Sequence, residues 1–223
     1  GEVLHRDSLG SEQVIRPGQV NLMTAGRGIS HTEQSLPEDP QLHAAQLWIA
    51  LPSAHRDTAP RFDHYPELPT WQEEGVTLTL LVGDLAGREA PTLTFSPLVG
   101  VDLAAEREAT LTLPLRPEFE YALLPLEGAP SLEGETLAVD ELAYLGRGRN
   151  AMALALPAGA RVLLIGGEPL GEEVLIWWNF VGHSKAEIVE AQREWKAGSE
   201  RFGRVAGFSD EERLMPPPLP WKG

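Results

Sequence analysis

The sequence contains no cysteine, and this excludes disulfide bonds, thiolate metal sites and thiol nucleophiles together. Any metal ion must therefore be held by His, Asp or Glu side chains. Long apolar runs are also missing. The longest, Val174 to Val181, is far shorter than the roughly 20 residues that a membrane span needs, and it contains Asn179. We expect no membrane-spanning helix and no membrane partner.

Basic residues are scarce as well. The chain has 18 Lys plus Arg against 33 Asp plus Glu, which gives a formal charge of −15. Most of the surface would repel a phosphate backbone, so no direct binding of nucleic acid is expected. No Gly-x-Ser-x-Gly nucleophile elbow is present. The segment Gly26-Arg27-Gly28 lacks the following helix pattern that a phosphate or dinucleotide loop requires.

Short apolar runs, separated by many Gly and Pro residues, indicate the fold class. Large apolar side chains occupy every second position in residues 77–80, 92–95, 110–113 and 151–156. Such alternation is typical of strands with one buried face. Turn signals lie between the runs, at Gly83-Asp84, Glu127-Gly128, Gly146-Arg147-Gly148 and Gly166-Gly167. The spacing predicts an all-β fold of antiparallel strands.

One helix is predicted near the end of the chain. Ser184 and Glu187 stand at the spacing of a capping box, an apolar pattern continues to Trp195, and Gly198 is a stop signal. The segment Trp177-Trp178-Asn179-Phe180 precedes this helix. We interpret it as core and inter-domain packing rather than as a binding platform.

Glycine positions suggest an internal repeat. Gly18 is followed by Gly26, and Gly159 by Gly167, with an apolar strand pattern between the members of each pair. Two copies of one β unit would form tandem barrels, with a junction in the Pro-rich, strand-poor stretch 52–71. Coincidence is the alternative, because Pro/Gly turns before apolar strands are common in β proteins.

The histidines point to a candidate metal site in the first part of the chain. All six lie outside residues 65–182, at positions 5, 31, 43, 55, 64 and 183. In an extended segment His31 and Glu33 project to one face, about 6.6 Å apart along the strand at ~3.3 Å per residue. Imidazole nitrogen and carboxylate oxygen suit Fe(II), Mn, Co, Ni or Zn. A hydrogen-bonded pair at a strand end remains the alternative.

The other candidate residues carry weaker signals. His5 could point inward from a first strand, but no spacing rule ties it to His31. The remaining histidines are interpreted as solvated or hydrogen-bonded; they are His43, His55, His64 and His183. The acidic residues Glu2, Asp7, Glu12, Glu172 and Glu173 are interpreted as parts of solvated faces.

Two stretches of the chain together resemble the pirin family of bicupins. The first contains His5-Arg6-Asp7-Ser8-Leu9-Gly10, Ile15-Arg16-Pro17-Gly18, Met23-Thr24-Ala25-Gly26-Arg27-Gly28-Ile29-Ser30-His31-Thr32-Glu33 and Leu47-Trp48-Ile49. The second contains Gly166-Gly167-Glu168-Pro169-Leu170-Gly171-Glu172, Trp177-Trp178-Asn179-Phe180-Val181 and Arg201-Phe202-Gly203, followed by a Pro-rich end. The resemblance covers nearly the whole chain, and the Met-Thr-Ala-Gly-Arg-Gly run with its following His-x-Glu is highly specific.

The resemblance implies two tandem cupin-type β-barrels and one C-terminal helix. We expect an N-terminal barrel at 1–55 with its first strands missing before Gly1, an inter-domain crossover at 56–70, and a second barrel without metal ligands at 71–182. The helix and Pro-rich tail, 183–223, would pack back on the first barrel.

In the family a mononuclear metal is held by three His and one Glu. His31 and Glu33 match the third His and the Glu, whereas the remaining two ligands, a His-x-His motif, are expected upstream of Gly1. With two of four ligands, the chain as given is expected to bind metal weakly. Fe(II) is the expected metal, and Ni, Co, Mn and Zn are the alternatives.

The resemblance also implies a function. Bacterial members are associated with quercetin 2,3-dioxygenase activity, in which the metal binds flavonol oxygens and O₂ and Glu33 is both ligand and proton acceptor. Animal members are associated with transcriptional co-regulation through protein partners, so a metal-binding regulatory protein is the alternative. The use of 15 Arg but 3 Lys, with abundant Ala and Leu, favours a bacterium with a GC-rich genome, and a cytoplasmic location is expected.

Overall fold

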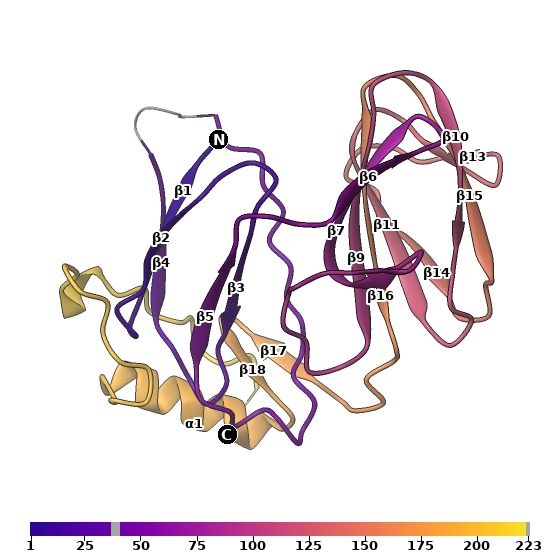
Figure 1. Cartoon of the computed structure of the whole chain (residues 1–223). Helices are drawn as coiled ribbons and strands as arrows, with labels where there is room; N and C mark the ends of the chain where they lie inside the picture. The colour runs from indigo at the N-terminus through magenta and orange to yellow at the C-terminus, as the bar shows by residue number, and fades with distance from the viewer. Residues whose placement is uncertain (37–40, 222–223) are drawn as a thin grey trace. The chain divides into compact units, whose positions relative to one another are not determined.

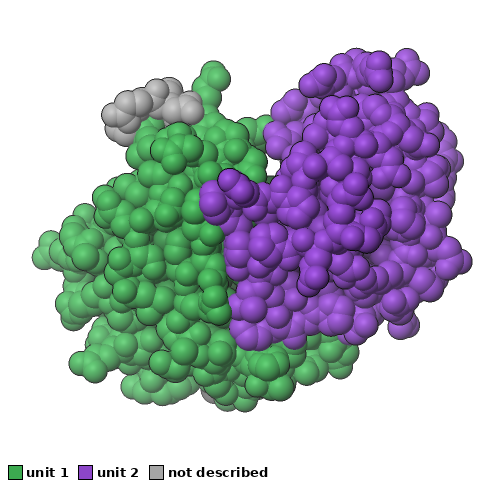
Figure 2. Space-filling view, viewed as in Figure 1, with its two compact units in different colours: residues 1–64, 170–223 green, residues 65–169 purple. Residues whose placement is uncertain are grey.

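The computed structural model describes residues 1–36 and 41–221 of the chain. The chain forms two compact units, which Figure 2 shows in different colours. Unit 1 comprises residues 1–64 and 170–223, and unit 2 comprises residues 65–169. The domain boundaries expected from the sequence stay a prediction.

Unit 1 is built from short antiparallel strands. Its first strands are β1 (Val3–Asp7), β2 (Glu12–Ile15), β3 (Val20–Thr24), β4 (His31–Ser35) and β5 (Arg61–Tyr65), the last of which reaches the boundary of the unit. One sheet has the order β2-β1-β4, and β3 pairs with β5 in a second (Figure 1). β5 and the start of β6 (Thr70–Glu73) lie in the stretch expected to be poor in strands, so that expectation is wrong for both. Pairing with β3 stabilises β5, and pairing with β7 (Val76–Leu85) stabilises β6.

The chain returns to unit 1 after residue 169. There the hairpin β17 (Leu175–Trp177) and β18 (Phe180–Gly182) is followed by helix α1 (Lys185–Lys196) and the short 3₁₀ helix η1 (Asp210–Glu212). Phe180, Ile188 and Phe202 form an apolar cluster, against which Trp177, Trp178 and Trp195 pack. The tryptophan segment therefore contributes to a core, as expected.

Helix α1 begins where the sequence predicts. The Ser184 side chain accepts a hydrogen bond from the Glu187 backbone N–H, and Gly198, at φ +69°, follows the last turn. The expected capping box is wrong in one detail. The Glu187 carboxylate accepts from the backbone N–H of His183 rather than from that of Ser184, so the reciprocal bond is displaced by one residue.

The segment after α1 contacts the loop before β4. The Arg201 Nε donates to the Arg27 carbonyl oxygen at 2.6 Å, and the Ser30 hydroxyl donates to the Gly203 carbonyl at 3.3 Å. Gly28, at φ +144°, leaves room for this approach: a Cβ there would lie 3.1 Å from atoms of Arg201 and Phe202. The C-terminal segment thus helps to fix the conformation of the loop that leads into His31.

Unit 2 consists of two antiparallel sheets. Its strands are β6 (Thr70–Glu73), β7 (Val76–Leu85), β8 (Arg88–Glu89), β9 (Leu98–Ala105), β10 (Ala109–Pro114), β11 (Glu120–Glu127), β12 (Ser131–Leu132), β13 (Glu135–Thr136), β14 (Ala143–Gly146), β15 (Ala151–Leu156) and β16 (Ala160–Gly167). The larger sheet has the order β14-β11-β16-β9-β7-β6, with β8 paired to β7, and the smaller has the order β10-β15-β12-β13.

The apolar alternation seen in the sequence forms the core of unit 2. β10 and β15 alternate between buried and exposed residues along their lengths, and their register places Leu111 opposite Leu154 and Leu113 opposite Met152. All four side chains are at most 1% exposed. The strands predicted at 77–80, 110–113 and 151–156 are confirmed, because one face of each is removed from water.

Three local predictions are wrong. Residues 92–95 form no strand: the Thr92 hydroxyl donates to the Leu81 carbonyl and the Leu93 N–H donates to the Tyr65 hydroxyl, so these polar groups are satisfied without a strand ladder. Gly83 lies inside β7 and Gly166-Gly167 inside β16 rather than in turns. At Gly83 a Cβ would lie 1.7 Å from the Leu98 carbonyl oxygen, so close approach of β9 explains the glycine.

Strands are the main regular secondary structure of the described residues, and α1 is their single α-helix, so the all-β prediction is confirmed. Among these residues we find no helix with the length and apolar character that crossing a membrane demands.

Candidate metal centre

Four ionisable side chains share one face of the sheet β2-β1-β4. β1 and β4 run antiparallel, and their register places His5 opposite Glu33 and Asp7 opposite His31. Directly opposed residues of an antiparallel pair point to the same face, as do residues two apart on one strand. His31 and Glu33 therefore project together, as the sequence predicts, and His5 and Asp7 join them from the neighbouring strand.

His5 occupies the centre of this group. Its Nε2 lies 3.2 Å from Asp7 Oδ2, and its Nδ1 lies 3.9 Å from Glu33 Oε1. The His5 ring stacks on Phe62 of β5, with ring centroids 4.2 Å apart and an interplanar angle of 9°. It also stacks with the His31 ring at 5.8 Å. The orientation of His5 is therefore fixed from several sides.

Asp7 and His5 are buried, whereas His31 and Glu33 are exposed. Only 1% of Asp7 and 2% of His5 is accessible to solvent. Asp7 Oδ1 accepts hydrogen bonds from the backbone N–H groups of Leu9 and Ser11, at 2.9 and 3.0 Å. The interpretation of Asp7 as part of a solvated face is wrong, because these bonds replace the water that burial removes.

The electrostatics favour the forms of His31 and Glu33 that bind metals. Loss of solvent around the imidazole lowers the pKa of His31 from its ordinary value, although the charge of Glu33 opposes this change. The adjacent His5 ring lowers the pKa of Glu33, assisted by the charge of His31 and opposed by burial. A neutral imidazole and an ionised carboxylate are the forms that coordinate a divalent metal.

The donor set fits part of a metal site. A neutral imidazole and a carboxylate on one face match the ligands preferred by first-row divalent metals. Within residues 1–36 and 41–221, however, no three His, Asp or Glu side chains are placed to hold a metal ion together. His31 and Glu33 thus provide two donors, and further donors are needed for tight binding.

The other histidines are placed elsewhere in unit 1. His64 Nδ1 lies 2.7 Å from the Asn21 Oδ1, and His183 Nδ1 lies 3.5 Å from Glu172 Oε2. Glu172 is exposed, as expected, and it also accepts hydrogen bonds from the Ser53 backbone and hydroxyl. His43 and His55 lie in the segment that connects β4 with β5.

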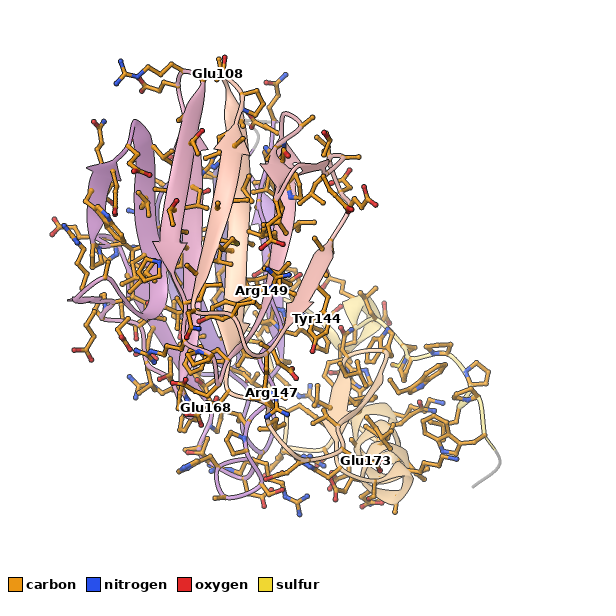
Figure 3. The ribbon with its side chains drawn as sticks, turned by 90° about the vertical axis from the view of Figure 1, so that its right-hand side faces the viewer. Glu108, Tyr144, Arg147, Arg149, Glu168 and Glu173 are labelled. Carbon is orange, nitrogen blue, oxygen red and sulfur yellow. The ribbon has the colours of Figure 1, made fainter. Side chains whose placement is uncertain are left out.

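Unit 2 offers different chemistry. A hollow in this unit is lined by Leu85, Val99, Phe119 and Tyr121 and carries the ion pair between Arg116 and Asp84. Residues 65–169 contain no histidine. Figure 3 shows further charged side chains on the surface of this unit, with Glu108, Arg147 and Glu168 labelled. The candidate metal ligands therefore lie in unit 1.

Comparisons with known proteins identify the family of the chain. The family model described as Pirin matches residues 1–49, and the model described as the Pirin C-terminal cupin domain matches residues 100–203. A Pseudomonas aeruginosa protein, provisionally named a quercetin 2,3-dioxygenase, is 63% identical over 222 residues, which cover 100% of this chain and 70% of that protein.

The chain belongs to the pirin family.

A pirin-like protein from Caulobacter vibrioides is 37% identical, with 89% of this chain and 70% of that protein covered. Among solved structures, a crystal structure of a quercetin 2,3-dioxygenase from Acinetobacter baumannii superimposes with a TM-score of 0.96 at 45% identity. That match covers 100% of this chain and 74% of the other. These findings confirm the all-β bicupin fold expected for a pirin.

The sequence predicts that His31 and Glu33 share a face, but it does not predict that His5 and Asp7 lie beside them. The alternation within β1 was the available signal, since residues 3, 5 and 7 share a face. It could not show which strand lies beside β1.

Proposed function

We propose that this pirin is a metal-dependent dioxygenase that uses O₂ to cleave quercetin or a related flavonol, with His31 and Glu33 as two of its metal ligands. One observation carries the proposal: an imidazole and a carboxylate project side by side from β4, backed by buried His5 and Asp7. The names of the 63% identical Pseudomonas protein and of the Acinetobacter structure support the choice of reaction.

Each residue has a distinct role in this proposal. The neutral His31 ring offers a nitrogen lone pair, and the ionised Glu33 offers carboxylate oxygens. Glu33 is also the group placed to accept the proton of a flavonol hydroxyl, because its side chain is 46% exposed and an incoming substrate can reach it. A bound divalent metal, Fe(II) in the first instance, would supply open coordination positions for flavonol oxygens and O₂.

Quercetin turnover by the native protein tests the proposal. The protein is loaded with Fe(II) and mixed with quercetin under air, and loss of flavonol absorbance and release of carbon monoxide are followed. We expect turnover by the wild type and its loss in Glu33→Gln and His31→Ala. The matched control is Glu190→Gln, since Glu190 is an exposed α1 residue paired with Arg193.

The outcomes separate the alternatives. Equal turnover by the wild type and both site variants would remove these two residues from the mechanism. Metal binding by a wild type that leaves quercetin intact would refute the reaction and favour a metal-binding regulatory protein that acts through protein partners.

A further inference from the structure

The ligand pair leaves the buried His5 without an assigned role. A histidine that is buried in a sheet face loses its hydration, which costs free energy unless both ring nitrogens have partners. Here one nitrogen faces Asp7 and the other faces Glu33. His5 therefore lies between a buried, fixed carboxylate and an exposed, candidate metal-binding one.

Asp7 provides the fixed end of this arrangement. Its Oδ1 is held by the backbone N–H groups of Leu9 and Ser11, and its Oδ2 contacts His5 Nε2. The parallel stack on Phe62 sets the plane of the His5 ring. With its plane and one nitrogen fixed, the direction of Nδ1 toward Glu33 is also determined.

Glu33 is the side chain that needs such a neighbour. It is 46% exposed, so its carboxylate has several orientations available in solvent. The 3.9 Å separation from His5 Nδ1 is an electrostatic contact, longer than a hydrogen bond. When Nδ1 carries a hydrogen, its attraction to the carboxylate favours the orientations of Glu33 that keep it beside His5 and on the face shared with His31.

We propose that His5, anchored by Asp7 and Phe62, is a positioning residue that orients the Glu33 carboxylate for metal binding. The inference rests on the proposed role of Glu33 as a ligand. His5 itself is not assigned as a ligand, because both of its ring nitrogens already face carboxylates. Groups that orient metal ligands in this way commonly alter metal affinity by about 10- to 100-fold.

Two amide substitutions separate the two nitrogens of His5. The amide nitrogen of Asn occupies a place similar to Nδ1, and that of Gln a place similar to Nε2. His5→Asn therefore keeps a donor toward Glu33 and abandons Asp7, whereas His5→Gln keeps a donor toward Asp7 and abandons Glu33. Chelator competition measures the Co(II) affinity of the native protein and of both variants. The visible absorption of the bound Co(II) and the unfolding temperature of each metal-free protein are measured as well.

We expect Co(II) affinity and unfolding temperature to rank the two variants in opposite orders. His5→Gln should lose about 10- to 100-fold in Co(II) affinity and change the Co(II) absorption, whereas His5→Asn should keep both near their wild-type values. His5→Asn should be the less stable protein, because it removes the ring nitrogen that contacts Oδ2 of the buried Asp7 carboxylate. A purely structural role for His5 would make metal affinity follow stability, and that result would overturn the proposal.

Further outcomes remain decisive. If an amide variant does not fold, Phe62→Leu takes its place, since it removes the stacked ring but no hydrogen-bonding group; an unchanged Co(II) affinity would then overturn the proposal. A wild type that binds no Co(II) would refute both the positioning role and the assignment of Glu33. If the wild type binds Co(II) and the two variants rank as expected, but the Fe(II)-loaded wild type cleaves no flavonol, only the proposed reaction is refuted.

Discussion

Glu33 on β4 lies directly opposite His5 on β1 in the antiparallel register. This pairing gives an exposed carboxylate a buried histidine as its neighbour, and the histidine is itself held by the buried Asp7. From the interior to the surface, the site therefore consists of a buried carboxylate, a buried imidazole ring and an exposed carboxylate.

The first prediction concerns metal retention by the 223 residues themselves. Two donors, His31 and Glu33, hold a first-row metal weakly, so dialysis of this chain should leave well below one equivalent of iron, nickel or zinc. Metal analysis of a preparation verified by mass checks the expectation. Stoichiometric retention would show that a third donor lies in this chain, and His5 would be the first residue to substitute.

The second prediction is a pH dependence that arises from Asp7. Burial acts to raise the pKa of Asp7, but hydrogen bonds from Ser11, His5 and Leu9 outweigh it, and the pKa is lowered from its ordinary value of 3.8. A lowered folded-state pKa means that the unfolded chain binds the proton more readily, so the stabilisation is complete above pH 3.8 and is lost as the pH falls through the folded-state value.

Denaturant titrations over a pH series measure this effect as the stability difference between the wild type and Asp7→Asn. The difference should be largest at neutral pH and should shrink as the pH falls below 3.8. A difference that stays constant down to the acid limit would contradict the prediction. Because Glu33 is present in both proteins, its own titration cancels in the comparison.

The third prediction concerns Gly26 in the loop before β4. Gly26 has φ +51°, and a Cβ there would lie 2.1 Å from the Thr58 carbonyl oxygen. Gly10 has φ +87° with nothing within 4 Å of its Cβ position, so Gly10→Ala measures the conformational cost alone, on the order of 1–2 kcal/mol. Gly26→Ala should cost more, because backbone must move; equal unfolding free energies for the two variants would show that the loop adjusts freely.

The fourth prediction concerns the start of α1. Ser184→Ala removes the hydroxyl that accepts from the Glu187 N–H and should lower the free energy of unfolding by about 1 kcal/mol. Ser184→Gly should cost only a few tenths of a kcal/mol, since glycine is itself a tolerated N-cap residue. Chemical denaturation of both variants checks the ranking, and a larger loss for glycine would indicate that the cap bond is not the stabilising feature.

Local patterns in the sequence determined much of unit 2 and part of the site. Alternation along 110–113 and 151–156 predicts strands because a pleated strand points successive side chains to opposite faces, one of them buried. The same geometry puts His31 and Glu33 on one face of β4. Ser184 and Gly198 mark the ends of α1 because their effects on backbone hydrogen bonding and dihedral angles are local.

Only the tertiary structure decided what surrounds these elements. Residues 92–95 carry the alternation of a strand, yet side-chain and backbone bonds to Leu81 and Tyr65 hold them outside any sheet. Asp7 has the sequence context of a solvated acid, but the backbone turn that follows it supplies two donors and buries it. The pairing of His5 with Glu33 depends on which strands become neighbours and in which register. Packing between residues distant in the chain determines this pairing. Alternation with a period of two is the same for every strand, so it cannot predict which strands become neighbours.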